Sequence, residues 1–72
     1  MELIITVEYD DEARVWVAQN DTLGLATEAE TMEVLTYKLQ EMIPELVELN
    51  NIDVPRPVAF TLVVRRPTVA FA

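Results

Sequence analysis

The sequence contains one long stretch of helical periodicity, and this stretch limits most strongly the folds that the chain can adopt. From Thr31 onward, apolar residues recur every three or four positions, which is the spacing of one face of an α-helix. The predicted apolar stripe consists of Met32, Leu35, Leu39, Met42, Ile43, Leu46 and Leu49. Thr31 suits the N-cap because its hydroxyl can accept a hydrogen bond from a free backbone N–H group. The pair Asn50-Asn51 ends the predicted helix.

Pro44 interrupts this pattern, because proline lacks the N–H group that would bond to the carbonyl of Gln40. We expect the helix to kink at Pro44, or to restart with Pro44 as its first residue. Pro44 falls on the predicted outer face, so the apolar stripe continues across it.

Two segments before the helix alternate their side chains in the manner of strands. Residues 2–9 and 14–19 are these segments, and the short polar turn 10–13 between them predicts an antiparallel hairpin. Residues 25–28 are long enough only for a brief third strand. We expect the role of Gly24 to be conformational, since glycine adopts a positive φ at little cost. A phosphate-binding loop is not expected there, because no second glycine and no lysine lie nearby.

Residues 58–65 form the predicted last strand, which gives the element order β-β-β-α-β. This order indicates an α+β fold in which one kinked helix covers one face of an antiparallel sheet. A single helix leaves the other face of the sheet uncovered, yet apolar residues are expected on both faces. The residues behind this expectation are Ile4, Thr6, Trp16, Ala18, Ala59 and Val63.

An uncovered apolar face predicts a protein partner. The length of the chain favours the same conclusion, because a domain of 72 residues buries only about 60% of the surface that its unfolded form exposes. The sequence has neither cysteine nor histidine, so neither a disulfide nor a zinc site is expected to reinforce the core. Oligomerisation is the remaining way to reinforce so small a core, and we therefore expect a homo-oligomer.

The net charge of −8 limits the class of partner. Such a chain repels the phosphates of nucleic acids and attracts basic proteins. A hydrophobic content of 51% argues against disorder. No apolar run approaches the roughly 20 residues of a membrane helix, and residues 1–15 do not resemble a signal peptide. We therefore expect a cytoplasmic protein without direct contact to nucleic acid or membrane.

The residue types do not favour catalysis. Serine, cysteine and histidine are absent, so a nucleophile with its usual base is not available. Asp10, Asp11 and Glu12 follow one another in a turn and point in different directions, which suits a solvated turn or a partner-binding patch better than a metal site. A remnant of a metal-dependent nuclease that uses Asp10, Asp21 or Glu28 is a further alternative. We expect a protein without enzymatic activity, cofactor or metal.

Three glutamates fall on the outer face of the predicted helix. Glu41 and Glu45 repel each other at i,i+4 spacing, and both lie with Glu48 toward the negative end of the helix dipole. These small costs favour a use as an acidic face for a basic partner, with a solvated face as the alternative. The predicted partner-binding residues are Asp10, Asp11, Glu12, Asp21, Glu41, Glu45 and Glu48. The predicted structural residues are Trp16, Gly24, Thr31 and Pro44.

Several linked positions resemble the HicB-like antitoxin family, and in particular its short branch, which carries the label of a domain of unknown function. The matching positions are Val15-Trp16-Val17-Ala18, Asp21, Gly24-Leu25, Thr27-Glu28-Ala29, Thr31, Glu33, Leu35, Pro44-Glu45-Leu46 and Asn50. The resemblance covers residues 3–50 well and the last strand loosely. It implies a partial RNase H-like fold of order β-β-β-α-β without ribonuclease activity.

The resemblance also implies an antitoxin of a type II toxin–antitoxin system, which binds a small basic RNase toxin of the HicA type and covers its active site. Longer family members carry a C-terminal DNA-binding domain. We expect residues 1–72 to form a single HicB-like domain without one. The alternative is an orphan oligomeric scaffold or regulatory protein with the same fold and no toxin partner.

Overall fold

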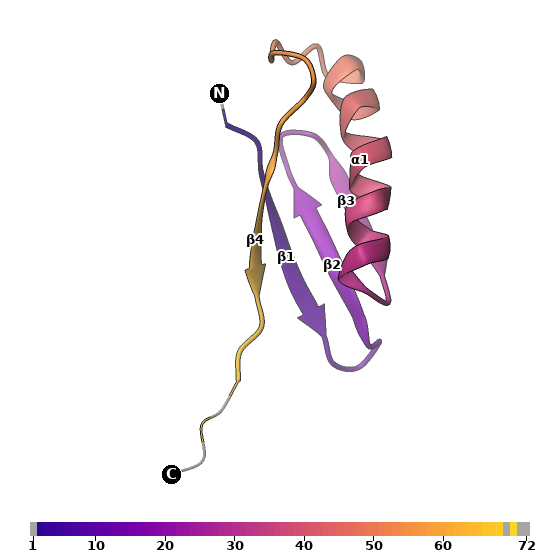
Figure 1. Ribbon diagram of the computed structural model, residues 1–72, viewed down its shortest axis with the longest axis vertical. Coiled ribbons are helices and arrows are strands. Elements are labelled where there is room, and N and C mark those ends of the chain that lie inside the picture. Colours follow the sequence, from indigo (N-terminus) through magenta and orange to yellow (C-terminus); the bar gives the residue numbers. More distant parts are fainter. Residues whose placement is uncertain (1, 69, 71–72) are drawn as a thin grey trace.

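The computed structural model describes residues 2–68 and 70, and in them the chain forms one sheet and one helix (Figure 1). The elements are β1 (Ile4–Asp10), β2 (Val15–Asn20), β3 (Leu25–Ala29), α1 (Met32–Leu49) and β4 (Thr61–Arg65). The α+β class and the order β-β-β-α-β are confirmed.

The strands lie in the order β3-β2-β1-β4, so β3 and β4 form the two edges of the sheet. The expected antiparallel pairing holds for β1 with β2 and for β2 with β3, but β4 runs parallel to β1. The sheet is therefore mixed. The physical reason is the long connection between β3 and β4, which carries α1 across the sheet and returns the chain in the direction of β1.

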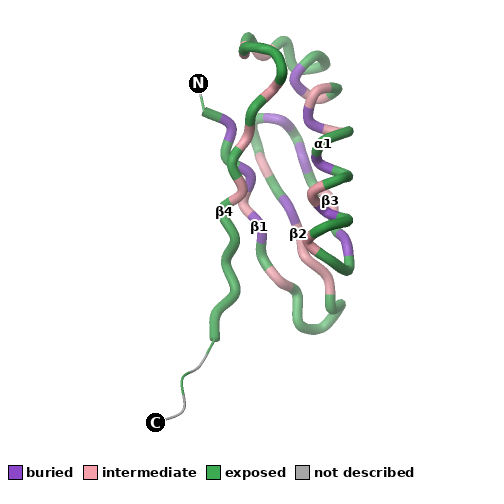
Figure 2. Tube along the Cα trace, in the orientation of Figure 1, coloured by how far each residue is buried: buried purple, intermediate pink, exposed green. Residues whose placement is uncertain are grey.

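Helix α1 packs over β2 and β3 and buries one apolar side (Figure 2). Its buried residues are Leu35, Leu39, Ile43 and Val47, and Met32, Met42 and Leu46 are partly buried against the same core. Each fully buried leucine or isoleucine contributes about 1.5–3 kcal/mol. The prediction was wrong for Leu49, which is 77% exposed, and it omitted Val47, which is 1% exposed. The helical period predicts the width of the apolar stripe. It does not predict how α1 lies against the sheet, and this tertiary contact decides that Val47 is buried and Leu49 is not.

Pro44 lies inside α1, which continues through it from Met32 to Leu49. A restart of the helix at Pro44 is therefore excluded. Pro44 is half-buried, so it lies on the flank of the helix and not on its fully exposed side. The buried neighbours Ile43 and Val47 hold the helix to the sheet on both sides of the missing hydrogen bond.

The cross-strand register assigns the sheet residues to two faces. Trp16 and Ala18 pair with Tyr9 and Val7, so of the residues expected on the two faces these two lie on the face that α1 covers. Ala59 lies before β4 and belongs to no strand. Cross-strand partners share a face of the sheet because successive side chains alternate. The open face, opposite α1, carries Ile4, Thr6, Glu8, Val15, Val17, Gln19, Ala26, Glu28, Val63 and Arg65.

Strand β4 is shorter than the predicted strand 58–65. Thr61 pairs with Ile4, the first residue of β1, so the preceding residues have no strand residue beside them. Val58 and Phe60 nevertheless pack against the core. Their alternation was predicted correctly, but their backbone does not join the sheet.

Candidate partner-binding surfaces

The turn between β1 and β2 uses the carboxylate of Asp10 for its own structure. Oδ1 of Asp10 accepts hydrogen bonds from the backbone N–H groups of Glu12 at 3.0 Å and Ala13 at 3.1 Å. The Asp10 carbonyl accepts from the N–H of Arg14 at 2.7 Å, and Arg14 has a φ of 56°. Asp10 therefore holds the turn through a carboxylate that stays exposed, and Asp11 and Glu12 are exposed beside it.

The loop between β2 and β3 contains Asp21 and Gly24. Gly24 has a φ of +64°, and its N–H group donates to the Asp21 carbonyl at 3.1 Å. No atom lies within 4 Å of the place where a Cβ of residue 24 would stand, so the backbone conformation alone favours glycine there. Asn20 closes the loop: its Oδ1 accepts from the N–H of Leu23 at 2.9 Å, and its Nδ2 donates to the Ile4 carbonyl at 2.8 Å. The side chain of Asp21 is exposed.

Asp10 and Asp21 lie at opposite ends of β2, whose six residues span roughly 20 Å. Glu28 lies on the open face of β3, across from Val17. The three carboxylates of the nuclease alternative therefore do not converge. Within residues 2–68 and 70, no group of three or more acidic side chains is arranged to hold a metal ion.

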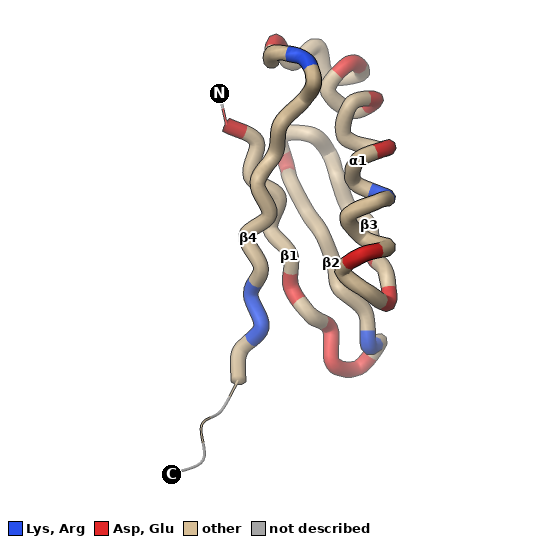
Figure 3. The backbone as a smooth tube through the Cα atoms, viewed as in Figure 1, with Lys and Arg blue, Asp and Glu red and all other residues tan. Residues whose placement is uncertain are grey.

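Helix α1 carries the acidic surface that the sequence predicted. Glu41, Glu45 and Glu48 are all exposed and lie on the side opposite the buried residues (Figure 3). Two exposed apolar residues continue the same side toward the N-terminus, namely Val34 at 49% and Tyr37 at 62% exposure. We call Val34, Tyr37, Glu41, Glu45 and Glu48 the helix stripe. Its apolar part was not predicted from the sequence, although Tyr37 lies four residues before Glu41 and therefore on the same side of the helix.

Within the helix stripe, Tyr37 and Glu41 interact. A hydrogen bond to the Glu41 carboxylate and its negative charge raise the pKa of the Tyr37 hydroxyl above its ordinary value of 10.0. Tyr37 therefore remains neutral at physiological pH. The three glutamates supply the charge of the helix stripe, and Val34 and Tyr37 supply its apolar contact area.

Two polar contacts hold the N-terminal half of the helix that presents the helix stripe. Thr31 is the N-cap, and its hydroxyl oxygen accepts from the N–H of Val34 at 3.1 Å. Lys38 is the one basic residue of α1, and its ammonium group donates to the Glu28 carbonyl at 2.7 Å. This contact ties the helix to the β3 edge and directs the positive charge away from the glutamates.

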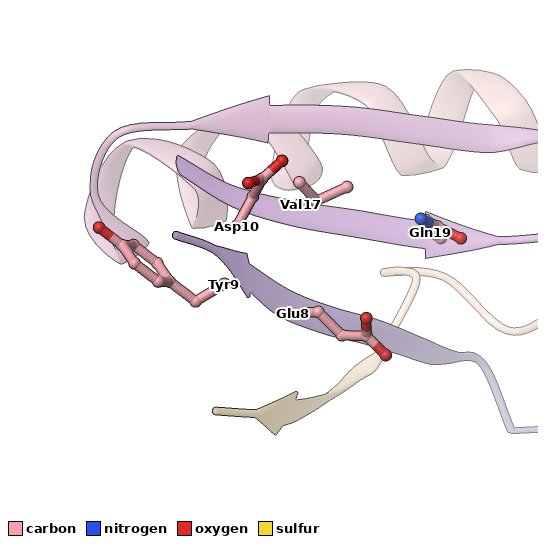
Figure 4. Close-up of a pocket in the computed structure, with 5 residues that line it drawn as sticks. All are labelled: Glu8, Tyr9, Asp10, Val17 and Gln19. Atoms are coloured by element: carbon pink, nitrogen blue, oxygen red, sulfur yellow. The ribbon is translucent and has the colours of Figure 1, made fainter. Parts of the chain in front are cut away.

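The open face of the sheet has a shallow hollow beside the turn between β1 and β2 (Figure 4). It is lined by Glu8, Tyr9, Asp10, Val17 and Gln19, and Figure 4 shows the Tyr9 ring turned away from the other four side chains. Its polar groups point to no particular ligand, because a carboxylate pair and one amide on an open strand surface suit water equally well.

On the face that α1 covers, Tyr9 and Trp16 form an aromatic pair beyond the helix. Their ring centroids are 4.9 Å apart with an interplanar angle of 61°, an edge-to-face arrangement. The guanidinium of Arg66 lies 4.5 Å from the centroid of Tyr9 and 5.6 Å from that of Trp16. This cation–π contact fastens the segment after β4 to the hairpin. The structural role predicted for Trp16 includes this contact, but no local sequence pattern places Arg66 beside it.

The predicted acidic residues therefore occupy three separate places. Asp10, Asp11 and Glu12 lie at one end of the sheet, and Asp21 lies in the loop at the other end. Glu41, Glu45 and Glu48 lie on α1. On the helix stripe, carboxylates adjoin the exposed apolar side chains of Val34 and Tyr37. Within the part of the chain that the structure describes, no helix is long and apolar enough to cross a membrane.

A family model and a solved structure each match nearly the whole chain. The crystal structure of the hypothetical protein TTHA1013 from the extremely thermophilic bacterium Thermus thermophilus matches with a TM-score of 0.82 and 45% sequence identity. The match covers 97% of this chain and 100% of that one. No curated protein matches the sequence significantly. The family model of a domain of unknown function, DUF1902, matches residues 2–71. The chain therefore belongs to the DUF1902 family.

Proposed function

We propose that the protein is a non-enzymatic interaction module of the HicB-like antitoxin type, which binds a small basic RNase toxin in the cytoplasm and masks its active site. The resemblance of residues 15–50 to that family supports the class of function. The helix stripe is the observation that carries the proposal, because it combines negative charge with exposed apolar area on a rigid element.

The two parts of the helix stripe have different tasks in this proposal. Tyrosine is favoured at the centre of interfaces because it buries a large, stiff side chain, so Tyr37 is the apolar anchor. Glu41, Glu45 and Glu48 attract a basic surface and speed the encounter. The repulsion between Glu41 and Glu45 is relieved when a cation of the partner lies between them.

The test begins with the reading frame next to the gene, which should encode a small basic protein. The two proteins are expressed together, and the dissociation constant is measured by calorimetry at low and high salt. Neutralising the helix stripe with E41Q/E45Q/E48Q should weaken binding on the order of tenfold, since each exposed charge contributes a fraction of a kcal/mol to about 1 kcal/mol. The weakening should shrink at high salt because ions screen exposed charges.

The control variant is D11N/E12Q/D21N, which removes the same charge from the other predicted acidic residues. It should leave the affinity within about twofold, a change that corresponds to roughly 0.4 kcal/mol. Equal losses for both triple variants would show that only the net charge matters. If the two proteins form no complex, the antitoxin proposal is refuted.

The alternative is an orphan scaffold or regulatory protein of the same fold. The apolar residues Val34 and Tyr37 favour it in one respect, because they serve any protein partner, whereas the glutamates favour a basic one. The orphan alternative predicts no basic protein in the neighbouring reading frame. It also predicts that a pull-down from the native host with wild-type protein, but not with Y37A, captures a partner that is not an RNase.

A further inference from the structure

Strand β4 is an edge strand whose outer side has no neighbouring strand in the described chain (Figure 1). The N–H group of Thr61 donates to the Leu3 carbonyl at 2.9 Å, so the backbone groups of Thr61, and by alternation those of Val63, point toward β1. The N–H and C=O groups of Leu62 and Val64 therefore point outward. An edge of this kind is a template for a further strand.

The side chains of β4 do not protect this edge. Val63 is 40% exposed on the open face, and Val64 is 46% exposed on the other face, beyond the area that α1 covers. Lysine and proline, which usually block edge pairing, do not occur in β4, and its one charged residue, Arg65, lies at the C-terminal end of the strand. Two exposed valines on opposite faces of one edge strand would both become covered if a second strand paired with β4.

The distribution of charge along the sequence distinguishes β4 from the helix stripe, the surface proposed to bind a basic partner. All 13 acidic residues lie within residues 2–53, whereas residues 54–72 contain three of the five basic residues and no acidic one. A basic protein is therefore repelled from the β4 segment and attracted elsewhere. The same distribution leaves β4 without carboxylates, so two copies of this acidic chain that meet at β4 bring no acidic residues of the two strands together.

We propose that β4 pairs with β4 of a second copy, antiparallel and centred on Val63, so that the two sheets join into one continuous sheet of eight strands. In this register Val63 lies opposite Val63 of the partner subunit, at a position without mutual hydrogen bonds. Leu62 lies opposite Val64 of the partner subunit, and their outward backbone groups exchange two hydrogen bonds. The two-fold symmetry repeats this pair, which satisfies the outward groups of both strands.

Opposite charges meet in this register. A hollow of about 410 Å³ at the start of β4 is lined by Glu2, Leu3, Ala59, Phe60 and Thr61. Arg65 of the partner subunit lies opposite Thr61, so its guanidinium approaches the end of the sheet that carries Glu2. A parallel arrangement in register would instead place Arg65 beside Arg65 of the partner subunit, where like charges repel. The charges therefore select the antiparallel arrangement.

The opposite edge of the sheet is less suited to pairing. Strand β3 lies under α1, and the Glu28 carbonyl is already bound to Lys38. Glu28 and Glu30 give this edge a negative charge in both copies. Pairing through β3 would bring these carboxylates of the two copies together, and the Glu28 carbonyl would have to release Lys38 to accept a bond from a further strand.

Cysteine cross-linking tests the contact and its register, because the natural chain has no cysteine. V63C should form a disulfide-linked dimer under mild oxidation, since the two residues are directly opposite. T61C is the matched control on the same exposed face of the same strand. The two T61C residues would be roughly 13 Å apart, four residues along the strand, and should cross-link at least about tenfold more slowly.

Sedimentation of the full chain without other proteins measures the dimer itself. The wild type should sediment as a dimer at micromolar concentration, and V64P should sediment as a monomer, because proline removes an outward N–H group and leaves the bonds to β1. Circular dichroism verifies that V64P is folded. A wild-type monomer, or T61C that cross-links as fast as V63C, would overturn the proposal. Both experiments are independent of the toxin, so their failure would leave the proposed function standing.

Discussion

The side-chain nitrogen of Asn50 lies 3.2 Å from the carbonyl oxygen of Leu23 and donates a hydrogen bond to it. The same Nδ2 lies 2.8 Å from the Leu46 carbonyl, which also accepts from the backbone N–H of Asn50 at 3.0 Å. One side chain therefore joins the C-terminus of the helix to the loop between β2 and β3. Leu23, only 1% exposed, is part of the core that this contact closes.

Replacement of Asn50 by alanine should reduce the free energy of unfolding by about 1–2 kcal/mol, because two carbonyl groups lose their shared donor. Urea unfolding followed by circular dichroism measures the change. Gln40→Ala, on an exposed part of the same helix, is the control and should change stability by less than about 0.5 kcal/mol. Equal effects of the two substitutions would mean that the contact between Asn50 and Leu23 does not stabilise the fold.

Gly24→Ala should destabilise the protein by about 1–2 kcal/mol. Space is not the reason, since nothing lies within 4 Å of the added Cβ, but a φ of +64° is unfavourable for alanine. Gly24→Asn should cost less, because asparagine adopts left-handed backbone conformations more readily. Thermal unfolding of the two variants decides the matter, and an asparagine variant as unstable as the alanine variant would refute the conformational explanation.

Much of the fold was predictable because its determinants are local. The hairpin needs only alternation on both sides of a short turn, and the helix needs only its period and a capping threonine at residue 31. The parallel pairing of β4 with β1 joins residues more than 50 positions apart, such as Ile4 and Thr61, and no local pattern reports it. The burial of Val47 in place of Leu49 depends in the same way on how α1 leans across the sheet.

The candidate site was predictable only in part. The helical period placed Glu41, Glu45 and Glu48 on one exposed side, where the structure also has them. The residues beside them were harder to recognise, because a single tyrosine such as Tyr37 could equally well belong to the hydrophobic core. Asp10 was misleading for another reason: its carboxylate accepts two backbone hydrogen bonds within its own turn, and the order of the three acidic residues does not indicate which of them does so.

The N-cap of α1 can be tested with a conservative pair of variants. Thr31→Ala removes the hydroxyl that accepts from the N–H of Val34 and should cost about 1 kcal/mol. Thr31→Ser keeps the hydroxyl and should retain most of that stability. Urea midpoints provide the comparison, and a serine variant no more stable than the alanine variant would contradict a capping role.

The contact between Tyr37 and Glu41 predicts a dependence on pH in the alkaline range. The hydrogen bond and the charge of Glu41 raise the pKa of Tyr37 in the folded protein above 10.0, so the folded state holds this proton more tightly than the unfolded chain does. The resulting stabilisation is complete below pH 10 and is lost as the pH rises through the raised pKa.

Absorbance near 295 nm in a Y9F background follows Tyr37 alone, since the chain has two tyrosines. Glu41→Ala should return the titration toward pH 10, whereas Glu48→Ala, about three helical turns from Tyr37, should not move it. A Tyr37 midpoint that is the same with and without Glu41 would show that the two side chains do not interact in solution.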